Sequence, residues 1–162
     1  MMKRILGIIA GLSLAVNVLA GSATFDFTDP SGVSNLSFDM TAPVESISGS
    51  ADGISGSIDF DPAKPEATNG TISVATSSLM VAKGKMRDHI MGSMWMDAKK
   101  YPEMKFELSG VSGLKTTGDG VFKGQANGTM TVKGVAKELN TEVTIKHLAG
   151  KLGAKLPGKK GD

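Results

Sequence analysis

Cysteine is absent from the 162-residue chain. Its absence excludes disulfide bonds, thiolate metal sites, a cysteine nucleophile and a lipid-modified cysteine at an export cleavage point. The chain is long enough for one domain with a real hydrophobic core. Without cross-links, that core has to stabilise the fold.

A surplus of basic residues is also missing. The chain has 18 Lys and Arg against 16 Asp and Glu, and removal of Lys3 and Arg4 with an N-terminal signal leaves 16 basic residues against 16 acidic ones. A neutral chain lacks the electrostatic footprint of a nucleic-acid-binding protein, so we expect no nucleic-acid partner. The charge is uneven, because the residues from Lys146 onward contain five Lys and one Asp.

Long hydrophobic runs are confined to the N-terminus. The basic start MMKR precedes the apolar run ILGIIAGLSLAVNVLA, and small residues follow at 18–20 and 21–23. This pattern predicts a signal peptide of residues 1–20, with a second cleavage choice at 23. The run is too short and too rich in small residues for a membrane anchor. We therefore expect a soluble exported protein, most simply in a bacterial periplasm.

Aromatic residues are scarce at 5%, whereas glycine is abundant at 21 residues and short apolar–polar alternations recur. This combination predicts an all-β, antiparallel, barrel-like domain whose strands each pack one face and expose the other to water. Seven strands are expected, at residues 24–28, 33–40, 54–61, 71–77, 104–111, 120–133 and 138–147.

The stretch 84–99 does not alternate. Met86, Ile90, Met94 and Trp95 recur there at helical spacing, which predicts one short helical segment within residues 84–98. A tyrosine–proline pair at 101–102 should end it before the next strand.

The stretch GVFKGQANGTMTVKG, residues 120–134, has polar residues at its odd positions and apolar or small residues at its even ones. A two-residue hairpin at 127–128 would place Phe122 on the same face as Lys133, so we predict one long strand instead. Inward residues are Phe122, Met130 and Val132, and outward residues are Lys123, Gln125, Thr129 and Thr131. The small inner residues Gly124, Ala126 and Gly128 have two interpretations: they permit tight coiling of the strand, or they leave space for a ligand.

Three segments together resemble a known family. They are GSIDFDPAKPEATNGTISVATSSL, MRDHIMGSMWMDAKKYPEMKFELSGV and GVFKGQANGTMTVKGVAKELNTEVTI. In this order they resemble the early strand pair, the helix-opening segment and the long strand with its following turn in the YceI family. That family consists of exported bacterial proteins described as polyisoprenoid- or lipid-binding, with a lipocalin-like barrel. The resemblance covers about residues 24–148 and specifies the fold more strongly than the ligand.

The resemblance implies that an apolar long-chain ligand of isoprenoid or fatty-acyl type lies inside the barrel. Because the sequence has no credible nucleophile or metal-ligand set, we expect no cofactor and no chemistry on the ligand. Met80, Met86, Met91, Met94 and Met96 would then lie near the mouth, because methionine adapts to loosely shaped apolar ligands. The candidate ligand-binding residues are Phe38, Met40, Ile58, Phe60, Ile72, Val74, Met86, Ile90, Trp95, Phe106, Leu108, Phe122, Gly124, Ala126, Met130, Val132, Val143 and Ile145.

Two other functions are weighed against this one. A small enzyme could use His89 as a base, with Asp88, Asp97, Glu103 and His147 as further candidates, but no Ser or Cys nucleophile has a motif around it. A periplasmic copper-binding module could use the thioethers of the methionine-rich helix together with His89. The helical spacing of these methionines favours a packing face instead.

The expected domain organisation is a signal peptide, a YceI-like barrel at 21–148 and a basic tail at 149–162. Family members continue with further strands, so two alternatives stay open: a closed barrel, or one left incomplete by truncation at its C-terminal edge. The tail is a candidate for weak contact with anionic membrane surfaces. Monomer and dimer both remain open.

Overall fold

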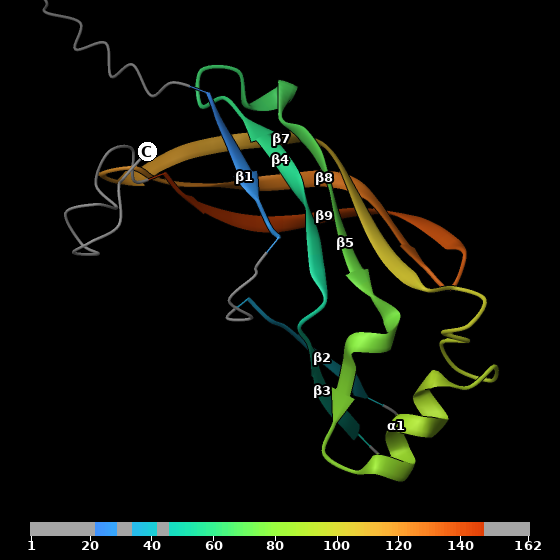
Figure 1. Cartoon of the computed structure of the whole chain (residues 1–162). Coiled ribbons are helices and arrows are strands. Elements are labelled where there is room, and N and C mark those ends of the chain that lie inside the picture. The colour runs from blue at the N-terminus through green and yellow to red at the C-terminus, as the bar shows by residue number, and fades with distance from the viewer. Residues whose placement is uncertain (1–21, 29–33, 42–45, 148–162) are drawn as a thin grey trace, which may run out of the picture.

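The computed structural model describes residues 22–28, 34–41 and 46–147, which fold into two antiparallel sheets and one α-helix (Figure 1). The larger sheet has six strands in the order β1-β4-β5-β7-β8-β9. Their bounds are β1 (Ala23–Asp26), β4 (Ile54–Phe60), β5 (Asn69–Ala75), β7 (Glu103–Gly118), β8 (Val121–Val132) and β9 (Val135–Lys146). The predicted all-β antiparallel class is confirmed.

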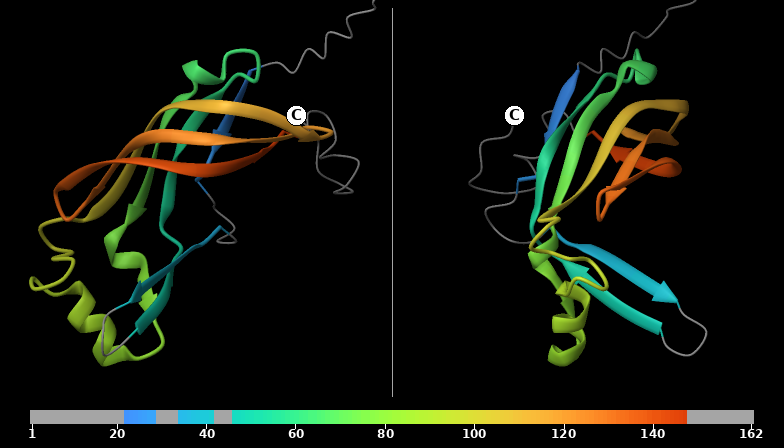
Figure 2. Two further views of the ribbon diagram at one scale, coloured as in Figure 1. Left: turned by 180° about the vertical axis from the view of Figure 1, so that it is seen from behind. Right: turned by 90° about the vertical axis from the view of Figure 1, so that its right-hand side faces the viewer.

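The smaller sheet has three strands in the order β2-β3-β6, namely β2 (Leu36–Thr41), β3 (Ser46–Ala51) and β6 (Leu79–Val81). The helix α1 (Gly84–Met91) follows β6 and lies beside this sheet at one end of the molecule (Figure 2). Two short 3₁₀ helices, η1 (Pro65–Ala67) and η2 (Thr76–Ser78), flank β5. The helix predicted within residues 84–98 is confirmed, and it ends at Met91.

The larger sheet curves strongly, because its long strands β7, β8 and β9 cross over β1, β4 and β5 (Figure 2). The pairing of β7 with β8 shifts register between Leu108 and Gly110 and again at two places further along β7. Each such bulge adds local bend and twist. Among the described residues β1 pairs only with β4 and β9 only with β8, so the sheet is a curved half barrel with two free edges.

The long strand predicted through the asparagine–glycine pair is confirmed as β8. Its pairing with β9 runs without interruption from Val121 to Val132, and the next two residues, Lys133 and Gly134, form the turn. Both turn residues have positive φ, 51° and 73°, as the two-residue hairpin of type I′ requires. The alternation of polar and apolar residues predicted the turn correctly, whereas the asparagine–glycine pair would have placed it at 127–128, inside β8.

Two of the nine strands in the described part of the chain were not predicted, and β7 extends to Gly118, seven residues beyond its predicted end. β3 and β6 have few large apolar residues in alternation: β3 reads SISGSA and β6 is only three residues long. β5 also ends at Ala75, two residues before its predicted end, because the chain turns into η2. β3 and β6 form by backbone pairing, β3 with β2 and β6 with β3, rather than through a strong apolar alternation of their own.

A hydrophobic cluster lies beneath the smaller sheet and α1. Ala51, Val74, Leu79 and Ile90 are buried at its centre. Ten partly buried apolar side chains surround them, contributed by β2, β3, β4, β6, β7, α1 and the segment after α1: Leu36, Phe38, Met40, Ile47, Ile54, Val81, Met86, Met91, Met96 and Met104. Ile54, Val74 and Met104 belong to strands of the larger sheet, so the cluster lies where the two sheets meet.

The predicted signal peptide and basic tail lie outside the described residues. Within the part of the chain that the structure describes, none of the helices has the length and apolarity needed to cross a membrane.

Candidate functional site

A pocket of about 440 Å³ opens on the concave side of the half barrel. Strands from both free edges contribute to it, so it spans the sheet from β1 to β9. Its lining residues are Phe25, Phe27, Ile58, Phe60, Thr68, Ile72, Phe106, Leu108, Val111, Ala126, Thr141, Glu142, Val143, Thr144, Ile145 and Lys146. Most are aliphatic or aromatic, and the polar ones lie mainly on the edge strand β9.

Aromatic side chains pack against one another at one end of this pocket. The ring of Phe60 lies 6.2 Å from that of Phe25 and 5.7 Å from that of Phe122, between their centroids. His147, just after β9, approaches Phe25 of β1 edge-on at 6.5 Å. The two free edges of the sheet therefore come close at this end, although no backbone pairing joins them among the described strands.

Thr68 is the one buried polar residue among those that line the pocket. It is buried, with 2% of its surface exposed, and its Oγ1 has no hydrogen-bond partner. Thr76, equally buried beside the other cluster, donates its hydroxyl to the carbonyl oxygen of Tyr101 at 2.8 Å. The pocket thus offers apolar surface almost throughout, and a bound molecule would be held mainly by burial of hydrocarbon.

The structure brings eight of the candidate residues together in this pocket: Ile58, Phe60, Ile72, Phe106, Leu108, Ala126, Val143 and Ile145. Five others belong to the cluster beneath the smaller sheet: Phe38, Met40, Val74, Met86 and Ile90. Period-two and helical patterns identify inward faces, but both compartments are apolar, so the sequence could not separate them.

The other candidates lie outside the pocket lining. Trp95 is 44% exposed. Phe122 packs on Phe60 at the aromatic end, whereas Met130 and Val132 are half-buried further along β8.

The interpretation of Gly124 and Gly128 as open space is wrong. A Cβ built on Gly124 would lie 2.9 Å from Cγ1 of Val111 and 3.0 Å from the carbonyl oxygen of Ser112. One built on Gly128 would meet the ring of Phe106 at 2.8 Å. Side chains of β7 already occupy both places, so these glycines allow close packing of β7 on β8.

Ala126, between the two glycines, faces the pocket. It is therefore the member of the small-residue set that borders free space.

Three apolar pocket residues are missing from the candidate set. Phe25 and Phe27 share one face of the strand predicted at residues 24–28, so the alternation of that strand could have identified both. Val111 faces inward only because the bulge between Leu108 and Gly110 shifts the alternation of β7 by one residue. A strict period-two reading places it on the wrong face.

The residues of the two alternative functions are dispersed. Met91 and Met96 pack into the hydrophobic cluster, whereas Met94 is 92% exposed. His89 and Asp88 are exposed on α1. Within the described ranges, no group of three or more His, Cys, Asp or Glu side chains lies close enough to hold a metal ion.

Comparison with known proteins identifies relatives of this chain. A UPF0312 protein of Pseudomonas putida is 33% identical over 90 residues, which cover 56% of this chain and 44% of the relative. A UPF0312 protein of Pseudomonas fluorescens is 29% identical over 99 residues, covering 61% of this chain and 50% of the relative. The matched part spans about half the length of these curated relatives.

Among solved structures, BcnA of Burkholderia cenocepacia superposes with a TM-score of 0.55 at 25% identity. The superposition covers 72% of this chain and 68% of BcnA. The sequence model of the YceI-like domain matches residues 16–159, which is nearly the whole chain. The protein therefore belongs to the YceI-like domain family.

Proposed function

We propose that this protein is an exported carrier that holds an apolar long-chain molecule, of isoprenoid or fatty-acyl type, in the concave pocket of its larger sheet. The observation that carries the proposal is the pocket of about 440 Å³ with a lining that is mainly aliphatic and aromatic. A pocket of this kind suits a hydrocarbon chain and offers little to a polar metabolite. Export rests on the N-terminal pattern of the sequence.

The proposed role is binding without chemistry. General acid–base or nucleophilic catalysis needs positioned reactive groups within hydrogen-bond reach of one another. The pocket has Glu142 and Lys146 at its β9 side and Thr68 inside, and no described residue of the lining is a histidine. The hydroxyl of Thr68 has no base beside it, because its Oγ1 has no hydrogen-bond partner.

Ligand identity is tested directly by mass spectrometry of an organic extract of the native purified protein. The proposal expects an amphiphile with a long hydrocarbon chain. A polar metabolite at stoichiometric amount would overturn the proposal.

A titration with prenyl and fatty-acyl probes of increasing chain length tests the physical basis of binding. Each additional buried methylene should lower the free energy of binding by about 0.8 kcal/mol until the pocket is full. Because most of the lining is uncharged, the affinity should change little between low and high salt. Affinity that is independent of chain length but falls with salt would contradict burial of hydrocarbon as the driving force.

A further inference from the structure

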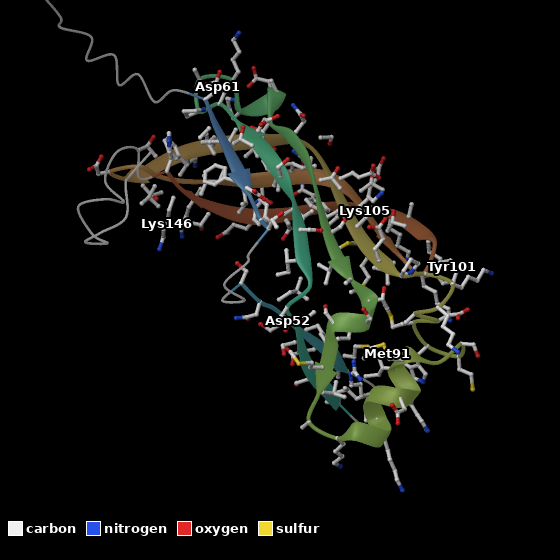
Figure 3. All side chains as sticks on the ribbon, in the orientation of Figure 1. Asp52, Asp61, Met91, Tyr101, Lys105 and Lys146 are labelled. Atoms are coloured by element: carbon white, nitrogen blue, oxygen red, sulfur yellow. The ribbon has the colours of Figure 1, made fainter. Side chains whose placement is uncertain are left out.

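The segment between α1 and β7, residues 92–102, exposes two large apolar side chains. Met94 is 92% exposed and Trp95 is 44% exposed. We call this segment the 92–102 loop. In Figure 3 the labelled residues Met91, which precedes the loop, and Tyr101, which lies near its end, are well apart from Lys146 of the pocket. The loop is therefore a different surface from the proposed ligand site.

Internal hydrogen bonds hold the backbone of this loop. The amides of Met96 and Ala98 donate to the carbonyl oxygens of Ile90 and Met91 at 3.0 and 3.1 Å, and the amide of Asp97 donates to Gly92 at 2.9 Å. The side chain of Met96 packs into the hydrophobic cluster. The exposure of Met94 and Trp95 is thus imposed by a folded turn.

The hairpin between β8 and β9 supports the loop from the other side. Nζ of Lys133 donates to the carbonyl oxygens of Ser93 and Met94 at 3.0 and 3.4 Å. The ring of Tyr101 lies against Gly134. A preorganised loop can present apolar side chains without losing further backbone entropy on binding.

Basic residues flank this apolar pair in the sequence. Residues 83–105 carry six of them, Lys83, Lys85, Arg87, Lys99, Lys100 and Lys105, against the three acids Asp88, Asp97 and Glu103. The described residues from 22 to 82 carry one Lys against six Asp and Glu, and residues 106–147 carry five Lys against four Asp and Glu. The segment that contains the 92–102 loop therefore has the largest excess of basic residues in the described part of the chain.

We propose that the 92–102 loop docks the protein on an anionic lipid bilayer, with Met94 and Trp95 in the interfacial layer and the flanking lysines on the lipid phosphates. Tryptophan is enriched at membrane interfaces, and apolar residues with a lysine-rich rim are typical of surfaces that lie on anionic lipid. A protein partner fits this surface less well, because lysine is depleted in protein–protein interfaces.

Trp95 is the only tryptophan in the chain, so its fluorescence reports on this surface alone. The full chain is titrated with vesicles of phosphatidylcholine and with vesicles that also contain phosphatidylglycerol. We expect a blue shift, and quenching by brominated acyl chains, with the anionic vesicles only. Added salt should reverse both. Equal binding to neutral vesicles, or no binding to anionic ones, would overturn the proposal.

Matched variants locate the contact. Binding to anionic vesicles should be weakened by Met94→Ser and by the double change Lys99→Gln with Lys100→Gln. At low salt the vesicle affinity should fall about fivefold for each lysine that is removed. The controls are Leu139→Ser, which removes an exposed apolar residue further along β9, and Lys115→Gln with Lys123→Gln, which removes two exposed lysines elsewhere. The controls should bind like the parent protein.

Two outcomes would assign the contact to another surface. The basic tail is present in every variant, so anionic binding that survives both loop changes belongs to the tail and refutes the proposal. A Trp95 blue shift that grows with protein concentration in the absence of vesicles would show a second copy of the chain on the loop, and would refute it as well. Neither result bears on ligand binding in the concave pocket, which the chain-length titration tests separately.

Discussion

Ala126→Leu is expected to weaken the binding of a hydrocarbon chain without unfolding the domain. Ala126 is 5% exposed, lies on β8 opposite Val111 and Thr141, and borders the pocket. Leucine adds three carbon atoms to the side chain, and these take the place of about three ligand methylenes. At about 0.8 kcal/mol per buried methylene the loss is about 2.4 kcal/mol, or about fiftyfold in Kd.

The assay is a titration of a fluorescent fatty-acyl or prenyl probe into the parent protein and the variant, with a thermal melting curve of each. Gln125→Leu is the matched control, because it adds an apolar side chain to the neighbouring residue on the outer, exposed face. The control should bind the probe normally. If Ala126→Leu binds the probe as tightly as the parent does, the chain does not occupy the pocket at β8. If it unfolds, the space beside Ala126 is already packed.

Two further predictions concern stability and are measured by urea denaturation. Gly124→Ala should lower the free energy of unfolding by about 1–3 kcal/mol, because the new Cβ would press on Val111 and Ser112. The control Gly84→Ala should cause no loss, because no atom lies within 4 Å of its new Cβ. Equal stability of the two variants would mean that β7 moves aside freely. Thr68→Val should cause no loss because its hydroxyl is unpaired, but Thr76→Val should cost about 1–3 kcal/mol by leaving the Tyr101 carbonyl unpaired. Equal losses from the two threonine variants would show that Thr68 has a partner.

The fold class, the helix and the inward face of β8 could be predicted from the sequence. Alternation with period two states which side of a strand is apolar, and over the length of β8 it outweighed the local asparagine–glycine turn signal. The helix was equally clear, because Met86 and Ile90 recur at helical spacing and both pack into the hydrophobic cluster. These features depend on residues close together in the chain.

Which apolar faces meet depends on contacts between elements far apart in the chain. Phe38 and Phe60 have the same pattern in the sequence, yet one lies beneath the smaller sheet and the other lines the pocket. The bulge in β7 turned Val111 inward, and Val111 then filled the space beside Gly124. Whether a small residue leaves a cavity or admits a neighbour depends on the register of the adjacent strand, and that register is set by contacts far apart in the chain.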